Sequence, residues 1–163
     1  MKELLTLAGR VGQRLKEREE TIAVAESSSG GLLSAALLSV PGASAYFRGG
    51  AVVYTGRARE VFLSLTRSQV SGMRSASEPY AMLLARTARE RFASSWGLSE
   101  TGAAGPTGNP YGDAAGHTCI ALAGPIDAAI TIETRNDDRV SNMEEFARKA
   151  LELLLRGLNE VPN

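Results

Sequence analysis

The segment at residues 21–38, TIAVAESSSGGLLSAALL, places the strongest constraint on how this chain can fold. Residues 21–25 form a short apolar run that is typical of a buried strand. Residues 32–38 form an alanine-rich apolar run that favours a helix. One carboxylate, three hydroxyls and two glycines lie between them, so the segment predicts a strand, a polar turn and a helix. The hydroxyls and the first free N–H groups of the helix then point the same way, which suits an anion or an oxyanion.

The rest of the chain interleaves strand patterns with amphipathic helix patterns. Its 163 residues, 44% apolar and 22% charged, are enough for one domain with a sizeable core. We therefore predict a single domain over residues 1–163 with an α/β fold, a three-layer α/β/α sandwich around a mixed central sheet. The predicted helices cover residues 2–19, 29–39, 57–65, 80–94 and 138–158. The predicted strands cover residues 21–25, 50–54, 118–122 and 128–134, and the last two pair across a turn.

Two local signals refine this prediction. Ser77, followed by an acidic residue and a proline, is predicted to cap the helix that comes next. Residues 102–117 are predicted to form a loop, because they are dense in Gly, Pro and Asn.

Residue counts exclude several classes of protein. Lys plus Arg and Asp plus Glu both number 18, so no basic excess favours nucleic acid or an anionic membrane as a partner. The single cysteine, Cys119, excludes an intrachain disulfide, and the single histidine, His117, excludes a two-histidine metal site. No apolar run is long enough to span a bilayer, and the N-terminus lacks the apolar core of a signal peptide. We expect a cytoplasmic protein that needs no metal.

Three polar segments, at residues 26–31, 54–59 and 101–108, can meet at one edge of the sheet. A serine nucleophile there needs a group that takes its proton and donors that hold the oxyanion. No histidine is close in sequence and the three lysines lie on predicted outer helices, so Tyr54 is the candidate partner. Taken alone, the serine run also fits an ordinary helix N-cap, and residues 101–108 fit an ordinary Gly-Pro turn.

His117 and Cys119 both have a simple structural interpretation. His117 begins a predicted strand. We predict that it is a structural histidine with satisfied hydrogen bonds rather than a catalytic one. Cys119 lies inside an apolar strand pattern and is predicted to be an inert core residue.

Four motifs follow one another along the chain: AESSSGGLLSAAL, VPGASAYFRGGAVVYTGRARE, SASEP and TGAAGPTG. Their order and spacing resemble the CinA carboxy-terminal domain family, over nearly the whole chain. Members of that family are nicotinamide mononucleotide (NMN) deamidases, which hydrolyse the amide of NMN to the acid and release ammonia. The chain looks like the stand-alone form, without the larger amino-terminal domain of full-length CinA proteins.

The resemblance implies roles for the matching residues of this chain. Ser27, directly after Ala-Glu, matches the family nucleophile, and Tyr54 and Arg59 complete the implied catalytic set. The implied substrate-binding residues are Glu26, Ser28, Ser29, Gly30, Gly31, Thr101, Gly102, Gly105 and Arg139. By analogy, the glycines offer backbone N–H groups to a phosphate or an oxyanion. The resemblance further implies a pyridine nucleotide as the small-molecule partner, no cofactor, and a homodimer.

Several positions differ from the family pattern, and Ser28, where the family has a cysteine, is a mild change. Arg59 stands where family members usually have a lysine, which is the base for the serine, and Gly56 stands where they have an asparagine. Asp113 stands where the family loop usually has a lysine. Because arginine stays charged at working pH, it positions and stabilises groups but is a poor general base. An alternative prediction is therefore a catalytically weakened or inactive member that acts as a nucleotide-binding or interaction protein. A serine amidase for a different small amide is the third prediction.

Overall fold

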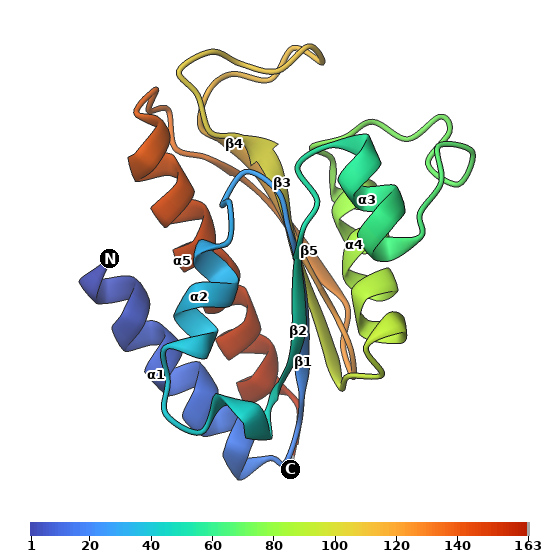
Figure 1. Cartoon of the computed structure of the whole chain (residues 1–163). Helices are drawn as coiled ribbons and strands as arrows, with labels where there is room; N and C mark the ends of the chain where they lie inside the picture. The colour runs from blue at the N-terminus through green and yellow to red at the C-terminus, as the bar shows by residue number, and fades with distance from the viewer. Residues whose placement is uncertain (163) are drawn as a thin grey trace.

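A five-stranded β-sheet lies between two layers of helices in the computed structural model, which describes residues 1–162 (Figure 1). The strands are β1 (Ile22–Glu26), β2 (Phe47–Val52), β3 (Trp96–Ala103), β4 (His117–Ala123) and β5 (Ala128–Glu133). The helices are α1 (Lys2–Glu17), α2 (Leu32–Leu38), α3 (Gly56–Leu63), α4 (Glu78–Arg91) and α5 (Arg139–Glu160), with a 3₁₀ turn, η1, at Ala43–Ala45. The predicted three-layer α/β/α fold is therefore confirmed.

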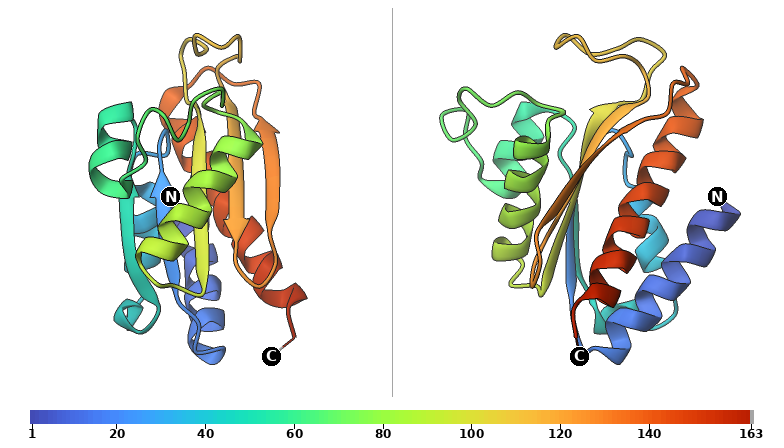
Figure 2. Two further views of the ribbon diagram at one scale, coloured as in Figure 1. Left: turned by 90° about the vertical axis from the view of Figure 1, so that its right-hand side faces the viewer. Right: turned by 180° about the vertical axis from the view of Figure 1, so that it is seen from behind.

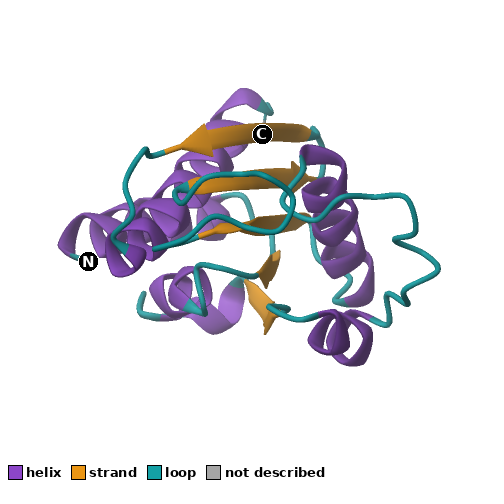
Figure 3. Cartoon of the chain, turned by 90° about the horizontal axis from the view of Figure 1, so that it is seen from above, coloured by secondary structure: helices purple, strands orange, loops and turns teal. Residues whose placement is uncertain are grey.

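The sheet is mixed, and its strand order is β2-β1-β3-β4-β5. β1 pairs in parallel with β2 and β3, whereas β4 pairs antiparallel with β3 and β5. The carboxyl ends of β1, β2 and β3 therefore meet at one edge of the sheet. The loop at residues 104–116 extends from this edge, at the top of Figure 1. Figure 3 looks down on the same edge and shows several connecting loops gathered there.

The two faces of the sheet carry different helices, as the views in Figure 2 show. α1, α2 and α5 pack against one face, and their core includes the fully buried side chains of Trp96 and Tyr46. α4 packs across the other face with α3 beside it, and this smaller core includes Leu63 and Leu84. Each fully buried leucine stabilises the fold by about 1.5–3 kcal/mol relative to an exposed one. The sheet is thus a firm base for the loops at its edge.

The element bounds differ from the prediction at two places that matter for the site. The helix predicted from residue 29 begins at Leu32, because Gly30 and Gly31 adopt positive φ angles of 65° and 98° in a turn. The central strand β3 was not predicted, and the predicted loop at residues 102–117 wrongly takes in its end. β3 contains polar residues and glycines that do not form a recognisable strand pattern. A strand buried on both faces shows no alternation of polar and apolar residues.

The finer local predictions hold. The Ser77 hydroxyl caps α4 by accepting a hydrogen bond from the N–H of Tyr80 at 3.4 Å. β4 and β5 pair across a short turn, as predicted. In the part of the chain that the structure describes, none of the helices combines the length and the apolar character needed to cross a bilayer.

Candidate active site

A cleft of about 260 Å³ opens at the edge of the sheet where β1, β2 and β3 end. The turn after β1, the segment from the end of β2 into α3, and the end of β3 all contribute to its walls. The residues that line it are Ser27, Val53, Tyr54, Thr55, Gly56, Arg59, Ser75, Ala76, Tyr80, Thr101, Gly102, Asn109 and Tyr111. The predicted convergence of three polar segments is therefore confirmed.

A second cleft, of about 210 Å³, adjoins the first. Its walls are Ser28, Tyr54, Gly102, Ala103, Ala104, Gly105, Thr107, Gly108, Asn109, Pro110 and Arg139. Tyr54, Gly102 and Asn109 line both clefts, so one extended ligand can occupy both. Among the described residues, Arg59 is the one charged side chain in the larger cleft, and Arg139 is the one in the smaller.

Glu26, the last residue of β1, holds the turn that follows it from inside the protein. Its side chain is fully buried. Its carboxylate accepts hydrogen bonds from Ser29 Oγ (2.8 Å), Gly31 N (3.0 Å), Leu33 N (3.1 Å), Ser34 N (3.0 Å) and Ser34 Oγ (2.6 Å). The anion predicted for the start of α2 is therefore the protein's own carboxylate, which satisfies the free N–H groups there. Glu26 lines neither cleft, and its carboxylate bonds the turn and the start of α2.

Glu100, in the middle of β3, is a second fully buried carboxylate at the same turn. It accepts hydrogen bonds from Ser28 Oγ (2.5 Å), Ser29 N (2.8 Å), Ser27 N (3.2 Å) and Thr118 Oγ1 (2.8 Å). No role was predicted for Glu100 from the sequence. The signal was an acidic residue in a stretch of small and apolar residues, since a buried carboxylate requires several donors.

The two carboxylates distinguish the three serines of the turn. The hydroxyl of Ser28 donates to Glu100, and that of Ser29 donates to Glu26. Ser27 is half-buried and lines the larger cleft, and its hydroxyl makes no hydrogen bond to the described residues. Ser28 lines only the smaller cleft, and Ser29 lines neither. Ser27 is thus the serine whose hydroxyl is left for a ligand.

Most backbone N–H groups of the turn are also engaged by the protein. The N–H of Ser29 donates to Glu100, that of Gly30 to the carbonyl of Ser27 at 3.1 Å, and that of Gly31 to Glu26. The N–H groups of Gly30 and Gly31, which the resemblance assigns to a ligand, thus both have protein acceptors here. Within the described residues 27–31, the N–H of Ser28 is the one without a protein acceptor.

Tyr54 stands between the two clefts, and 58% of its surface is exposed. Arg139, the first residue of α5, donates from Nη2 to the Tyr54 hydroxyl at 3.3 Å and from Nη1 to the carbonyl of Gly105 at 2.6 Å. Arg139 therefore links the end of β2 to the loop that follows β3.

Arg59 is buried in the wall of the larger cleft, with 9% of its surface exposed. It donates from Nε to the carbonyl of Leu65 at 3.1 Å and from Nη1 to the hydroxyl of Tyr80 at 3.3 Å. Its hydrogen-bonded tyrosine is thus Tyr80, whereas Tyr54 is bonded by Arg139. The three lysines lie on α1 and α5, and none lines either cleft.

The remaining implied binding residues lie at the end of β3, in the loop after it and at the start of α5. Thr101, Gly102, Gly105 and Arg139 all line one or both clefts. A Cβ at Gly102 would lie 2.3 Å from the carbonyl oxygen of His117, so β3 and β4 meet here too closely for a side chain. Gly105 combines a φ of 105° with a carbonyl oxygen of Asp137 only 2.8 Å from an added Cβ. Glycine is required at both positions to shape the site.

His117 is a buried structural residue, as predicted. Its Nδ1 contacts the carboxylate of Glu133, and its Nε2 donates to the carbonyl of Ala76 at 2.8 Å. Burial opposes the imidazolium, but these two hydrogen bonds and the charge of Asp113 outweigh it and raise the pKa of His117. Cys119 is also buried, and burial raises the pKa of its thiol.

Asp113 stands in the loop over the site, at a position where the family usually has a lysine. It accepts hydrogen bonds from Arg74 Nη1 at 2.7 Å and from Asn109 Nδ2 at 2.8 Å. Partial burial opposes the carboxylate form, but these hydrogen bonds hold the pKa of Asp113 below its usual value. Asn109 lines both clefts, so Asp113 acts by fixing the loop.

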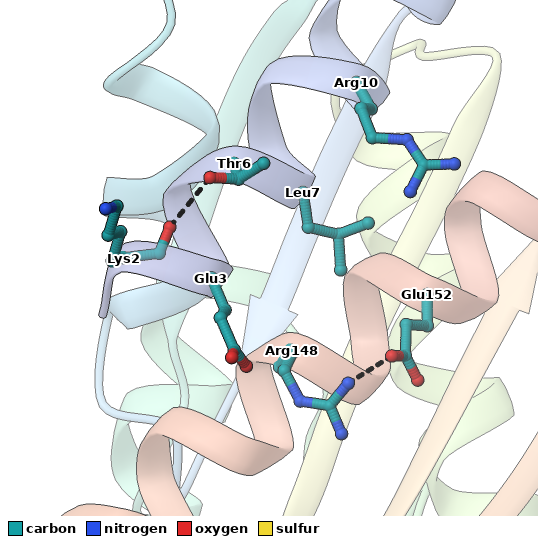
Figure 4. Close-up of a pocket in the computed structure, with 7 residues that line it drawn as sticks. All are labelled: Lys2, Glu3, Thr6, Leu7, Arg10, Arg148 and Glu152. Carbon is teal, nitrogen blue, oxygen red and sulfur yellow. Dashed lines mark hydrogen bonds and ion pairs between the residues drawn. The ribbon is translucent and has the colours of Figure 1, made fainter.

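A wider groove lies elsewhere, between α1 and α5 (Figure 4). It measures about 470 Å³ and is lined by Lys2, Glu3, Thr6, Leu7, Arg10, Arg148 and Glu152. Arg148 pairs with Glu152 and with Glu145, so charges of both signs neutralise each other there. This groove lacks the free hydroxyl and the converging strand ends of the first cleft.

Comparison with known proteins finds a matching domain family and similar folds. The profile of the CinA C-terminal domain matches residues 4–158. A CinA-like protein of Chlorobium limicola is 37% identical over 161 residues, which cover 96% of this chain and 38% of that protein. The chain thus spans less than two-fifths of the length of that curated relative.

Solved structures show the same fold. A CinA superfamily protein from Klebsiella pneumoniae superposes with a TM-score of 0.90 at 22% identity, covering 97% of this chain and 99% of that one. The competence/damage-inducible protein CihA from Agrobacterium tumefaciens superposes with a TM-score of 0.88 at 26% identity, covering 97% of this chain and 96% of that one. From the matched domain, the relative and the fold together, this chain belongs to the CinA C-terminal domain family.

Proposed function

We propose that the chain hydrolyses the carboxamide of NMN to nicotinate mononucleotide and ammonia, with Ser27 as the nucleophile. The state of the Ser27 hydroxyl carries the proposal. It lines the cleft without a hydrogen bond to the described residues, whereas Ser28 and Ser29 are held by buried carboxylates. The resemblance of the motifs to NMN deamidases supports the choice of substrate.

The two adjoining clefts suggest how the nucleotide is oriented. Arg139 and the loop after β3 suit the phosphate, because a guanidinium binds phosphate oxygens with charge-assisted hydrogen bonds. The pyridine ring then occupies the larger cleft, with its carboxamide beside Ser27 and Thr101. In this orientation the nucleotide runs past Tyr54, which lines both clefts.

The reaction follows in two steps. Ser27 Oγ attacks the amide carbon, and its proton passes to the amide nitrogen through the hydroxyl of Tyr54. The oxyanion accepts a hydrogen bond from the N–H of Ser28, and the C–N bond then breaks to release ammonia and leave an ester on Ser27. Water hydrolyses that ester, which restores the serine and gives the acid.

Ammonia release from NMN by the purified protein tests the proposal. The wild type should release ammonia, and Ser27→Ala should reduce the rate to the level without protein. Ser75→Ala is the matched control, because Ser75 lines the same cleft but has no role in the reaction; it should retain the wild-type rate. If the wild type releases no more ammonia than Ser27→Ala, hydrolysis of NMN is excluded.

A second candidate function is nucleotide binding with little or no turnover. The buried position of Arg59 favours it, since the cleft contains neither a lysine nor a histidine nor a carboxylate among its described walls. Loss of a general base typically costs about 10²–10⁴-fold in rate. Calorimetric titration with NMN, set beside the ammonia assay, separates the two functions: binding without turnover identifies a binding protein.

A further inference from the structure

Arg59 is a buried cation that has no partner of opposite charge among the described residues. Its two hydrogen-bond acceptors, the carbonyl of Leu65 and the hydroxyl of Tyr80, are both neutral. Among the described residues, Nη2 has no acceptor, and no carboxylate lines the cleft in which Arg59 lies. Other arginines of the chain do pair with acids, for example Arg57 on the same helix, which lies 3.7 Å from Glu60.

A buried charge without a counter-charge is unfavourable, and arginine does not escape this cost by losing its proton. The remaining N–H groups of Arg59 belong to a cleft wall, so an anion on a ligand can satisfy them. The planar fork of a guanidinium matches the two oxygens of a carboxylate, with two parallel hydrogen bonds. The other walls supply neutral hydroxyl and amide groups, which do not repel a carboxylate.

We propose that Arg59 binds a carboxylate of the ligand, so that this site prefers a mononucleotide whose base carries an acid over one whose base carries the amide. The carboxylate at Arg59 is inferred from the cleft alone; the choice of a pyridine nucleotide rests on the proposed function. Arg139 in the adjoining cleft meets the second anion, the phosphate. A ligand with one negative group at each end thus matches one arginine in each cleft.

The preference has a consequence for the proposed reaction. Nicotinate mononucleotide is the product of that reaction. The product should therefore bind in the cleft more tightly than NMN and inhibit turnover. Tyr80 is a positioning residue in this account, because its hydroxyl fixes one nitrogen of the Arg59 guanidinium.

Calorimetric titration with a matched pair of ligands tests the proposal. Nicotinate mononucleotide and NMN differ in little but one negative charge, and the Ser27→Ala protein converts neither. The acid should bind about 10- to 100-fold more tightly than the amide, as expected for charge-assisted hydrogen bonds to one carboxylate. Arg59→Gln should abolish this preference, and Tyr80→Phe should reduce it without changing the affinity for the amide.

Three controls make each outcome decisive. Arg57→Gln removes an arginine of α3 that is 80% exposed, and should leave the preference intact. Arg139→Gln should reduce the affinity for both ligands by the same factor. If Arg59→Gln does not fold, Arg59→Lys leaves an amino group but removes the planar fork, and should lower the preference severalfold.

Equal affinities for acid and amide, or a preference that survives Arg59→Gln, would overturn the inference. An equal loss of affinity for both ligands in Arg59→Gln would overturn it as well, since Arg59 would then bind the phosphate that the two ligands share. The ammonia assay decides the proposed function separately, because a preference for the acid can exist with or without turnover. Absence of binding by either nucleotide would overturn both proposals.

Discussion

Glu26 shows at the level of one residue how the site is held without touching the ligand. Three donors converge on its Oε2 and two on its Oε1, so neither oxygen can be exchanged for an amide NH₂ without a clash of donors. We predict that Glu26→Gln lowers the free energy of unfolding by about 2–4 kcal/mol. Chemical denaturation of the purified variant measures this loss.

Glu60→Gln is the control for that experiment. Glu60 lies on α3 with a half-exposed side chain that pairs only loosely with Arg57, at 3.7 Å. Its replacement should change the free energy of unfolding by no more than about 0.5 kcal/mol. Similar losses in the two variants would mean that the buried network around Glu26 is not what holds the turn.

Single residues also show where sequence reasoning succeeds and where it stops. Ser27 could be selected from three adjacent serines through the family motif, and it is the one whose hydroxyl stays free in the cleft. The same motif could not say that Glu26 faces inward, because its partners lie up to eight residues ahead on a helix that begins later than predicted. Glu100 reaches the turn from β3, a long-range contact that leaves no local pattern.

At the level of elements, His117 connects β4 and β5 to the segment that precedes α4. Its ring lies between Glu133 of β5 and the carbonyl of Ala76, with Asp113 at 3.6 Å and Arg74 paired to that aspartate. Because both ring nitrogens face acceptors, the fold favours the charged imidazolium, in line with the raised pKa of His117. Ala76 also lines the larger cleft, so this connection supports its wall.

Because the pKa of His117 is raised in the folded state, the stability of the protein should fall as the pH increases. The contribution of His117 is fully present below its ordinary pKa, about 6.5, and is lost as the pH rises through the raised value. We predict that the wild type loses stability relative to His117→Gln as the pH rises above about 6.5. Denaturation curves of both proteins across that range measure the difference, and parallel pH profiles would contradict the assignment.

The elements themselves could be predicted where one periodicity dominates. α1 and α5 show clear apolar stripes, and β4 and β5 show apolar runs around a Gly-Pro turn, so all four were predicted within a few residues. β3 was missed because its polar residues, including Glu100 and Thr101, are buried by partners far away in the sequence. The site depends on that strand, which explains why its geometry could be only partly predicted.

At the scale of the whole molecule, two buried carboxylates and two arginine-bearing clefts lie at one edge of a mixed sheet. The family, the fold and the meeting of the three polar segments were all predictable from the motifs. The homodimer and the cytoplasmic location stay predictions. The position of Arg59 was not predictable, since only the fold shows that it is buried in the wall of the cleft that Ser27 also lines, bonded to Tyr80.

The central claim is that a serine amidase site is present and that Arg59 sets what it does with its ligand. The rate of ammonia release from NMN, measured side by side for the wild type, Ser27→Ala and Arg59→Lys, tests it most directly. The account predicts a slow but measurable wild-type rate, none for Ser27→Ala, and a rise of about 10²-fold or more for Arg59→Lys, because a lysine can serve as the missing base. Wild-type and Arg59→Lys rates that both equal that of Ser27→Ala would contradict it.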